Sequence, residues 1–334
     1  MKIAVVGAGA IGGYLAVKLS RAGNDVTCIA RGPNLAAIQA KGMSLILEDG
    51  TVEDAPNIRG VQKMADAGVQ DVVLLTLKAH QVKDVAADMR ALFGPDTLVV
   101  TMQNGIPWWY FHKLGGDYEG TPVTSVDPDG IVAANIEVER VIGSVVYPAS
   151  ELVEPGVIKL IEGNRFTLGE LDGSRSPRIE ALSQAMIAAG FKSPVSKDIR
   201  SEMWVKLWGN LSFNPISALT HATLEDICRF PLTRELAANM MREAQAVGEK
   251  LGVEFKIGLD KRIAGAEAVG AHKTSMLQDV EAGRPLEFEA LVGSVRELGR
   301  ITGIPTPNID AVYALVSLLA RTLSDKKGKL SIDG

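Results

Sequence analysis

The chain has 334 residues, more than one hydrophobic core usually organises, so two domains are expected. Its 35 basic and 40 acidic side chains give a net charge of −5, which offers no general attraction to nucleic acid or to an anionic membrane. Cys28 and Cys228 lie far apart without metal-ligand spacing, so no disulfide framework or metal centre is predicted and a reducing, cytoplasmic setting is expected. The apolar run 311–320 is shorter than the roughly 20 residues of a transmembrane helix.

The N-terminal segment joins a short apolar run, 2–6, to a glycine-rich turn and a segment with helical periodicity, 14–21. In this context the spacing Gly7-x-Gly9-x-x-Gly12 is the dinucleotide-binding fingerprint. The glycines permit a tight turn, close approach to a pyrophosphate, and close packing of the helix on the strand. The predicted cofactor contacts here are Gly7, Gly9, Ala10, Ile11 and Gly12. The alternatives are a plain glycine-rich turn and a signal peptide, and the missing cleavage-site pattern argues against the second.

The second predicted strand, 25–30, should end beside the adenosine ribose of a bound dinucleotide. NAD-preferring sites place a carboxylate at this position, whereas this chain has Arg31, followed by Gly32 and Pro33. A guanidinium binds a 2′-phosphate, and no carboxylate repels it. We therefore predict NADP(H) as the cofactor. The alternative is that Arg31 is a solvated loop residue.

Three further strands are predicted at 43–47, 71–77 and 97–101. A helix at about 81–92 separates the last two strands. This alternation predicts a doubly wound parallel sheet, in which ligands lie at the carboxyl ends of the strands. Lys78 and Asn104 both follow such ends. The aromatic run 106–111 comes next, and it either packs in the core or walls the substrate site.

Between 130 and 169 the pattern changes to short β-prone runs broken by Pro and Gly, which predicts hairpins and a mixed sheet edge. The runs are 131–134, 141–147, 157–161 and 166–168. A helix at 176–189 and a last strand at 191–195 follow. Because nearly every later segment has helical period, we predict an α/β fold with a Rossmann-type doubly wound sheet in domain 1–197 and an all-helical domain, 198–334.

The segment 203–215 is strongly apolar, yet it carries one amine and two amides. Lys206, Asn210 and Asn214 recur at intervals of four, so on a helix they form one stripe. An unpaired buried polar group costs roughly 2–7 kcal/mol by transfer estimates. The stripe therefore needs partners from the protein or from a ligand. The alternative is a surface lysine and two asparagines that fray a helix ahead of Pro215.

Five motifs stand in the order found in a known family. They are the glycine fingerprint, Lys78-x-x-Gln81, Gln103-Asn104-Gly105, Lys206-x-x-x-Asn210-x-x-x-Asn214-Pro215, and Ser275-Met276-Leu277-Gln278-Asp279 running to Arg284-Pro285-x-Glu287. On these residues the chain resembles, along almost its whole length, the ketopantoate reductase family. These are 2-dehydropantoate 2-reductases of the 6-phosphogluconate dehydrogenase-like group.

The resemblance implies NADPH-dependent reduction of a 2-oxo acid bound between the two domains. The expected substrate is 2-dehydropantoate (ketopantoate), reduced to pantoate in pantothenate biosynthesis. The resemblance also implies that Lys206 is the catalytic acid and that Asn104 and Glu287 belong to the catalytic centre. The implied substrate-binding residues are Asn210, Asn214 and Ser275, and the predicted cofactor contacts also include Arg31, Lys78, Asn104 and Glu287.

This residue set suits the chemistry. Hydride delivered to a ketone carbon leaves an alkoxide, which needs a proton and hydrogen-bond donors. A lysine ammonium supplies both if burial lowers its pKa toward the working pH. Ser275 can donate to a substrate carboxylate, and Glu287 can accept from the ammonium or from a substrate hydroxyl. Taken singly, Ser275 as a helix N-cap and Glu287 as a solvated helix charge are the alternatives.

Three features depart from the family pattern and suggest a bulkier or less polar 2-oxo acid. His272 stands where an asparagine is frequent, Leu224 stands where some members have a polar side chain, and the segment 107–110 is unusually heavy. Two other functions stay open. One is a related NADP-dependent hydroxy acid or opine-type dehydrogenase, for which His221 has no obvious carboxylate partner in sequence. The other is a non-catalytic NADP-sensing protein. The helices near 311–323 pack within the domain or across a homodimer.

Overall fold

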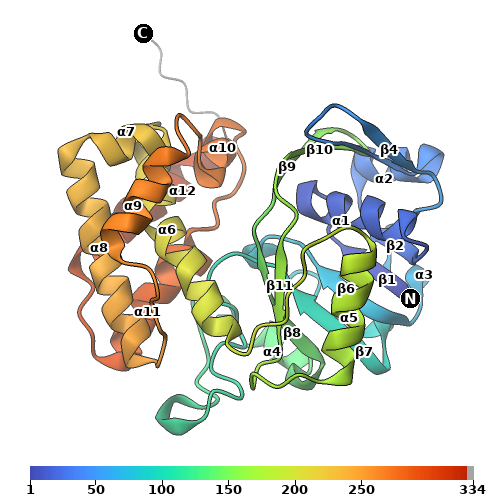
Figure 1. The fold of residues 1–334 in the computed structure, drawn as a ribbon, viewed down its shortest axis with the longest axis horizontal. Coiled ribbons are helices and arrows are strands. Elements are labelled where there is room, and N and C mark those ends of the chain that lie inside the picture. The colour runs from blue at the N-terminus through green and yellow to red at the C-terminus, as the bar shows by residue number, and fades with distance from the viewer. Residues whose placement is uncertain (329–334) are drawn as a thin grey trace. The chain divides into compact units, whose positions relative to one another are not determined.

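The computed structural model describes residues 1–328, and the chain divides into two compact units (Figure 1). Unit 1 comprises Met1–Pro122 and Asp129–Ile199, and unit 2 comprises Val123–Pro128 and the chain from Arg200 onward. The segment Val123–Pro128 is held within unit 2 by Glu297, whose carboxylate accepts hydrogen bonds from the backbone N–H groups of Thr124 and Ser125, both at 2.8 Å. No sequence pattern indicated this excursion, because the contact joins residues more than 170 positions apart.

Unit 1 is built on a seven-stranded sheet in the order β11-β8-β7-β6-β1-β2-β5. The strands are β1 Lys2–Val6, β2 Asp25–Ile29, β5 Arg59–Val61, β6 Gln70–Leu75, β7 Phe93–Thr101, β8 Val141–Val146 and β11 Phe166–Gly169. Every pairing is parallel except that of β11 with β8. Strands buried on both faces read as nearly continuous apolar runs, which is why β1, β6 and the second half of β7, 97–101, were predictable. The predicted α/β class with a Rossmann-type sheet is confirmed.

A second, four-stranded sheet in the order β4-β3-β10-β9 packs against helix α1 (Ala10–Arg21). Its strands are β3 Met43–Ile46, β4 Val52–Ala55, β9 Ala149–Glu154 and β10 Val157–Glu162. A Cβ atom at Gly13 of α1 would lie 2.6 Å from Ile158 and 2.8 Å from Met43, so the glycine allows the close packing. The sequence predicted hairpins at a mixed sheet edge, but it did not indicate this separate sheet, because β3 and β10 pair across more than 100 residues.

The remaining helices of unit 1 are short, apart from α2 and α5. They are α2 Gly32–Lys41, α3 Met64–Ala67, η1 Ala79–Gln81, η2 Asp88–Leu92, η3 Gly116–Tyr118, α4 Ile131–Asn135, η4 Val138–Arg140 and α5 Pro177–Ala188. The predicted single helix over 81–92 was wrong: turns and two 3₁₀ helices, η1 and η2, occupy this region. The backbone hydrogen bonds show the difference: Gln81 N donates to Lys78 O at 2.9 Å and Val85 N donates to Val82 O at 3.1 Å, the i to i−3 pattern of 3₁₀ turns.

Two predicted strands of unit 1 were also wrong. Residues Ile131–Asn135 form helix α4, because Val132 and Ile136 are buried four positions apart, the spacing of a helix face. Residues 191–195 make only isolated bridges, at Lys192 and Val195. Pro194 lies between these two positions and has no N–H to continue a ladder.

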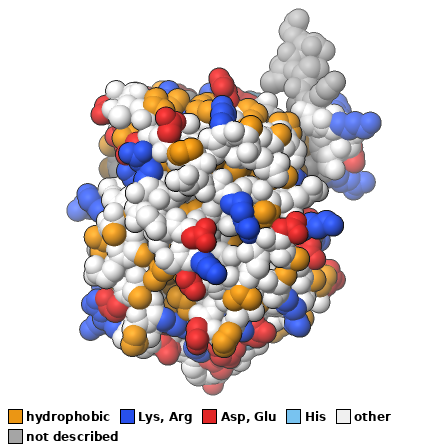
Figure 2. All heavy atoms as spheres, turned by 90° about the vertical axis from the view of Figure 1, so that its right-hand side faces the viewer, with side chains coloured by type: hydrophobic (Ala, Val, Ile, Leu, Met, Phe, Trp, Pro, Cys, Tyr) orange, Lys and Arg blue, Asp and Glu red, His pale blue; other side chains and the backbone are white. Residues whose placement is uncertain are grey.

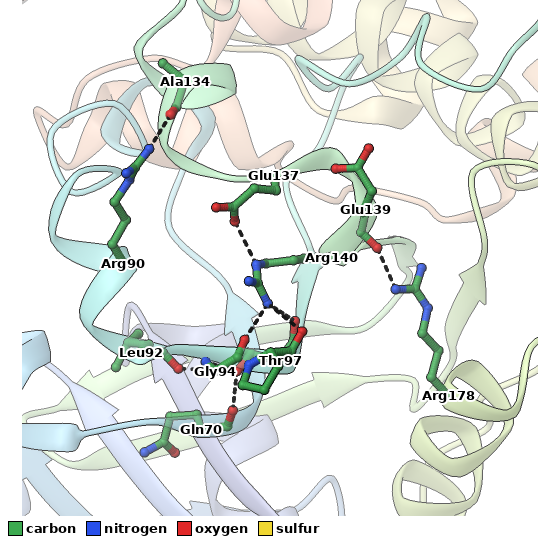
Figure 3. Close-up of polar contacts among 11 residues, drawn as sticks. Gln70, Arg90, Leu92, Gly94, Thr97, Ala134, Glu137, Glu139, Arg140 and Arg178 are labelled. Carbon is green, nitrogen blue, oxygen red and sulfur yellow. Dashed lines mark hydrogen bonds and ion pairs between the residues drawn. The ribbon is translucent and has the colours of Figure 1, made fainter.

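Arginine side chains tie together the amino-terminal ends of β7 and β8 (Figure 3). Arg140 donates from Nη1 to the carbonyl oxygens of Gly94 (2.7 Å) and Thr97 (3.3 Å), and from Nε to Glu137 (2.7 Å). Arg90 donates to the carbonyl oxygen of Ala134 at 2.7 Å. These bonds satisfy irregular backbone at this end of the sheet, as buried polar groups require. The cluster is therefore structural, and the candidate site lies at the opposite ends of the strands.

The described part of unit 2 is helical (Figure 1). Its elements are α6 Ile199–Thr220, α7 Leu224–Arg229, α8 Pro231–Lys250, α9 Leu259–Ala268, α10 Ser275–Glu281, the π-helix η5 Glu289–Gly293, α11 Ser294–Thr302 and α12 Pro307–Asp325. Helix α8 packs against α7, α9, α11 and α12. Its Glu243 accepts hydrogen bonds from the backbone N–H groups of Asn308 and Ile309 at the start of α12, both at 2.9 Å. The predicted helical C-terminal part is confirmed.

The surface carries mixed charge. On the face shown in Figure 2, Lys and Arg side chains lie among Asp and Glu side chains. One ion pair of unit 1 joins Lys18 to Glu53 at 3.0 Å. Among residues 1–328, no helix combines the length and the apolar character needed to cross a membrane.

Candidate active site

Apart from Glu287, which lies in unit 2, the predicted cofactor residues follow four neighbouring strands of the large sheet. Asn104 follows β7, Lys78 follows β6, the turn Gly7–Gly12 follows β1, and Arg31 follows β2. Because these strands are adjacent and parallel, their carboxyl ends lie along one edge. Strand β1 pairs with β6 on one side and with β2 on the other, so the chain order reverses here. Such a switch point is where open α/β sheets bind ligands.

The turn after β1 depends on its glycines. Gly7 has φ +106°, and a Cβ atom there would lie 2.8 Å from Leu77 Cδ2. At Gly12 a Cβ atom would overlap the Gly7 carbonyl oxygen and lie 2.6 Å from Thr76 Oγ1. At Gly9 a Cβ atom would meet nothing within 4 Å. Two glycines therefore serve packing, and the third faces open space where a ligand can approach.

The start of helix α1 fits an anionic group. The first hydrogen bond within the helix runs from Gly13 N to Gly9 O at 2.7 Å, so the N–H groups of Ala10, Ile11 and Gly12 have no acceptor within the helix. The helix dipole adds positive potential, and the first turn contains no acidic residue. These groups suit the diphosphate of a dinucleotide.

Gln103 and Gln81 shape the neighbouring edge. The Gln103 side-chain amide donates to the carbonyl oxygens of Leu75 (2.7 Å) and Leu77 (3.1 Å), which ties the ends of β6 and β7 together. The Gln81 side chain accepts from the backbone N–H of Lys78 at 3.2 Å. The two glutamines of the sequence motifs thus hold Lys78 and Asn104 in place. Arg31 is exposed at the start of α2.

Helix α6 presents Lys206, Asn210 and Asn214 on one face. The helix continues through Pro215 to Thr220, so the alternative of a helix that frays ahead of the proline was wrong. Asn214 is buried, whereas Lys206 and Asn210 are partly buried. Both asparagines therefore lie on a regular, continuous helix, which gives the stripe a fixed geometry.

The opposite face of α6 anchors the helix in the core of unit 2. Trp204 and Trp208 are fully buried there. The indole N–H of Trp208 donates to the carbonyl oxygen of Met241 at 2.6 Å, and its ring centroid lies 4.8 Å from that of Phe255. Burial of two large aromatic side chains stabilises the helix by several kcal/mol on the usual scale of roughly 1.5–3 per side chain. The residues of the polar stripe, on the other face, are therefore not needed to hold the helix in place.

The ammonium group of Lys206 is desolvated, although the residue keeps some exposed surface. Burial lowers the pKa of Lys206 to about 8, and the Glu287 carboxylate acts in the opposite direction. The structure thus places Lys206 and Glu287 within electrostatic reach of each other in unit 2. A lysine with such a pKa can donate a proton near neutral pH.

Ser275 lies beside Asn214, whose side-chain amide donates to the serine hydroxyl at 3.5 Å. The alternative that Ser275 caps helix α10 was wrong, because Thr274 is the N-cap and accepts from the backbone N–H of Leu277 at 3.2 Å. Ser275 is the first residue of the helix and is exposed. The structure thus brings together the stripe and a serine 61 positions away.

Asp279 and Arg284 form a pair whose role the sequence reasoning missed. Asp279 is buried and accepts from Arg284 Nε at 2.9 Å, while its carbonyl oxygen accepts from the Arg284 backbone N–H at 2.8 Å. The pair closes the loop after α10 and leads the chain to Glu287, just ahead of the π-helix η5. Short π-helices are frequent at functional sites. The available signal was a carboxylate and a guanidinium five positions apart around Gly283.

The structure also places the aromatic run, the two residues that depart from the family pattern, and His221. In the aromatic run, Trp109, Tyr110 and Phe111 are fully buried, so for these three the core-packing interpretation is confirmed. The backbone N–H of Leu224 donates to the carbonyl oxygen of His272 at 3.0 Å, which places the two residues that depart from the family pattern side by side. His221 is exposed, with φ 59°, in the turn after α6.

A Rossmann-type sheet with a glycine turn at its switch point, joined in one chain to a helical unit that carries a desolvated lysine, defines an oxidoreductase of the dinucleotide-binding class. The family model "Ketopantoate reductase PanE/ApbA" matches residues 3–173, and its C-terminal counterpart matches residues 198–320. The chain belongs to the ketopantoate reductase family, a family of NAD(P)-dependent oxidoreductases.

Individual relatives agree with this assignment. A 2-dehydropantoate 2-reductase of Mesorhizobium japonicum is 58% identical over 96% of this chain and 98% of its own. A crystal structure from Ralstonia solanacearum, described as a candidate ketopantoate reductase, has 41% identity and a TM-score of 0.92 over 96% of this chain and 98% of that one. A D-mandelate dehydrogenase solved with NADH and anilino(oxo)acetate has a TM-score of 0.82 at 22% identity over 97% of this chain and 100% of that one, a likeness of fold alone.

Proposed function

We propose that this protein reduces 2-dehydropantoate to pantoate with NADPH, as a step of pantothenate biosynthesis. The observation that carries the proposal is the desolvated Lys206 on the same helix face as Asn210 and Asn214. Membership of the family and the 58% identity to a relative named 2-dehydropantoate 2-reductase support the substrate. The reaction converts a 2-oxo acid, NADPH and a proton into a 2-hydroxy acid and NADP⁺.

Unit 1 supplies the cofactor-binding residues of this proposal. The N–H groups at the start of α1 bind the diphosphate, Arg31 binds the 2′-phosphate, and Lys78 and Asn104 line the same edge. When bound, NADPH supplies a hydride to the carbonyl carbon of the substrate. Asn104 contributes neutral hydrogen-bonding groups without adding a competing charge.

Unit 2 supplies the acid. The ammonium of Lys206 donates a hydrogen bond to the substrate carbonyl oxygen and transfers its proton to that oxygen as negative charge develops there. Glu287 supports the charged form of Lys206, since its carboxylate raises the pKa that desolvation lowers. Asn210 and Asn214 orient the substrate, and Ser275, already hydrogen-bonded to Asn214, can donate to its carboxylate.

The test is a turnover assay of the purified protein with NADPH and a panel of 2-oxo acids. We expect the highest kcat/KM for 2-dehydropantoate and lower values for pyruvate, 2-oxoisovalerate and aryl-substituted 2-oxo acids. A high kcat/KM for a bulkier acid, with no turnover of 2-dehydropantoate, would overturn the proposed substrate but would leave the proposed reaction, reduction of a 2-oxo acid, in place. No consumption of NADPH with any acid would support a non-catalytic NADP-binding protein.

One observation favours a second candidate substrate, a bulkier or less polar 2-oxo acid. Leu224 and His272 lie side by side through a backbone hydrogen bond of 3.0 Å, and Thr274 and Ser275 follow two and three positions later. An apolar side chain and an imidazole would bound a different pocket from two small polar side chains. The same panel of acids decides between the candidates.

Arg31→Ala should distinguish NADPH from NADH. A charge-assisted hydrogen bond contributes about 1.5–3 kcal/mol, so we expect the Kd for NADPH to rise about 10- to 100-fold, with little change for NADH. Titration of the cofactor by fluorescence measures both constants. Arg175→Ala is the matched control, because Arg175 is an exposed arginine of unit 1 that precedes α5 and pairs with Glu180 of that helix. Equal Kd values for NADPH in the wild-type and Arg31→Ala proteins would contradict the assignment.

A further inference from the structure

The aromatic run after Asn104 contains one residue that differs from its neighbours. Trp109, Tyr110 and Phe111 have no exposed surface, and the indole N–H of Trp109 donates to Thr101 Oγ1 at 2.9 Å. Trp108 is 8% exposed, and its Nε1 atom is buried without a hydrogen-bond acceptor among residues 1–328. Two adjacent tryptophans thus have opposite hydrogen-bonding states.

The segment that carries Trp108 is held firmly at the carboxyl end of β7 and β8. Trp109 contacts both strands there, since Thr101 is paired in register with Gly143, and a Cβ atom at Gly143 would lie 2.9 Å from the Trp109 ring. The backbone turns tightly at this point, with Tyr110 N donating to Pro107 O at 3.1 Å. The Trp108 ring packs edge-on against His112 at a centroid distance of 6.0 Å. The unpaired donor therefore belongs to an ordered side chain.

A buried donor without an acceptor is destabilising, and folded proteins keep few of them. A phenylalanine would fill similar apolar space without that penalty. An indole at this position is therefore best explained by an acceptor that arrives with a ligand. The ligand must reach the edge of the sheet at β7 and β8, four residues after Asn104.

Strand order indicates which ligand this is. The residues suited to the nucleotide and diphosphate, Arg31 and the glycine turn, follow β2 and β1. Trp108 lies in the segment anchored on β7 and β8, on the other side of β6. We propose that the indole N–H of Trp108, which has no acceptor among residues 1–328, is a substrate-binding donor that hydrogen-bonds the carboxylate of the 2-oxo acid. This proposal rests on the proposed function, because it takes the substrate to be a 2-oxo acid.

Trp108→Phe tests the proposal, because it removes the donor and keeps an aromatic ring. Loss of a hydrogen bond to a charged group should raise KM for the 2-oxo acid about 10-fold or more, with a smaller change in kcat and an unchanged Kd for NADPH. The Tm of the ligand-free variant should equal or exceed that of the wild type, since an unsatisfied donor is removed. An unchanged KM overturns the proposal.

Trp109→Phe is the matched control. It removes a donor that is already paired with Thr101, so its Tm should fall. Wild-type turnover separates the two proposals. If the wild type reduces a 2-oxo acid and Trp108→Phe has the same KM, only the Trp108 proposal fails. If the wild type reduces no 2-oxo acid, the proposed function fails. The Trp108 proposal is then decided by a second measurement, the increase in Tm that pantoate produces in the wild-type protein and in Trp108→Phe. Equal increases, or none in either protein, overturn it.

Discussion

Lys206→Met should lower kcat for reduction of the 2-oxo acid by about 10²- to 10⁴-fold, the usual contribution of a general acid. The Kd for NADPH should change little, because Lys206 lies in unit 2 and the predicted cofactor contacts other than Glu287 lie in unit 1. Stopped-flow or steady-state assays with saturating NADPH measure the loss. Lys250→Met is the control, because Lys250 is an exposed lysine at the end of α8. A Lys206→Met protein with more than a tenth of wild-type kcat would contradict the role of the lysine.

The pH dependence of the same reaction has a defined sign. The proton donor is the charged ammonium, and burial lowers its pKa to about 8, so kcat/KM for reduction should fall as pH rises through 8. Oxidation of the 2-hydroxy acid needs the neutral amine as base and should show the opposite trend. Glu287→Gln removes the carboxylate that raises the pKa of Lys206, so the fall should move to lower pH. An unchanged pH profile in Glu287→Gln would contradict the influence of Glu287 on the pKa of Lys206.

Folding stability provides an independent check on Lys206. The folded-state pKa of about 8 is below the ordinary value of 10.5, so the unfolded chain holds the proton more tightly. The unfavourable contribution of the charged lysine is fully present below pH 8 and is relieved as pH rises from 8 to 10.5. Lys206→Met should therefore not lower the free energy of unfolding at pH 7. A large loss of stability would indicate a structural lysine.

Gly12→Ala should lower the free energy of unfolding by about 1–3 kcal/mol, the usual effect of an overpacked site, and should abolish tight cofactor binding. The added Cβ atom would overlap the Gly7 carbonyl oxygen and crowd Thr76 Oγ1, so α1 must move away from β1. Chemical denaturation and titration with NADPH measure the two effects.

Gly9→Ala is the matched comparison for Gly12→Ala. A Cβ atom at Gly9 would meet nothing within 4 Å, and the Gly9 φ of −79° is open to alanine. The free energy of unfolding should stay the same, but binding of NADPH should weaken, because the methyl group occupies space where a diphosphate approaches the backbone. Unchanged NADPH binding by Gly9→Ala would contradict the assignment of this turn to the cofactor site.

Much of the fold was predictable because its signals are local. The strands β1 and β6 and the second half of β7, 97–101, are largely apolar runs, and α6 carries its polar residues at helical spacing. Prediction failed where short segments contain signals for more than one structure. Residues 131–134 are β-prone in composition, yet the burial of Val132 and Ile136, four positions apart, selects a helix. In 79–92 the backbone closes i to i−3 hydrogen bonds, although the buried spacing of Val82, Ala86 and Met89 suits an α-helix equally well.

Roles within the site divide in the same way. The types and spacings of Lys206, Asn210, Asn214, Ser275 and Glu287 could be read from the chain, together with a resemblance to a family. The sequence could not decide whether Ser275 or Thr274 caps α10, or that Asp279 and Arg284 close the loop before Glu287. Those outcomes depend on hydrogen-bond geometry, which residue types do not specify.

The sequence by itself determined the fold class, the glycine turn and the polar stripe, because each is read from local signals: apolar runs, helical period and short spacings. The tertiary structure alone decided three further matters. It placed the ends of β7, β6, β1 and β2 side by side, and it desolvated Lys206 near Glu287. It also paired Trp109 with Thr101, while the Trp108 indole N–H has no acceptor among the described residues, 1–328. The physical reason is that burial and pairing depend on the groups that surround a side chain, and most of those groups come from distant parts of the chain.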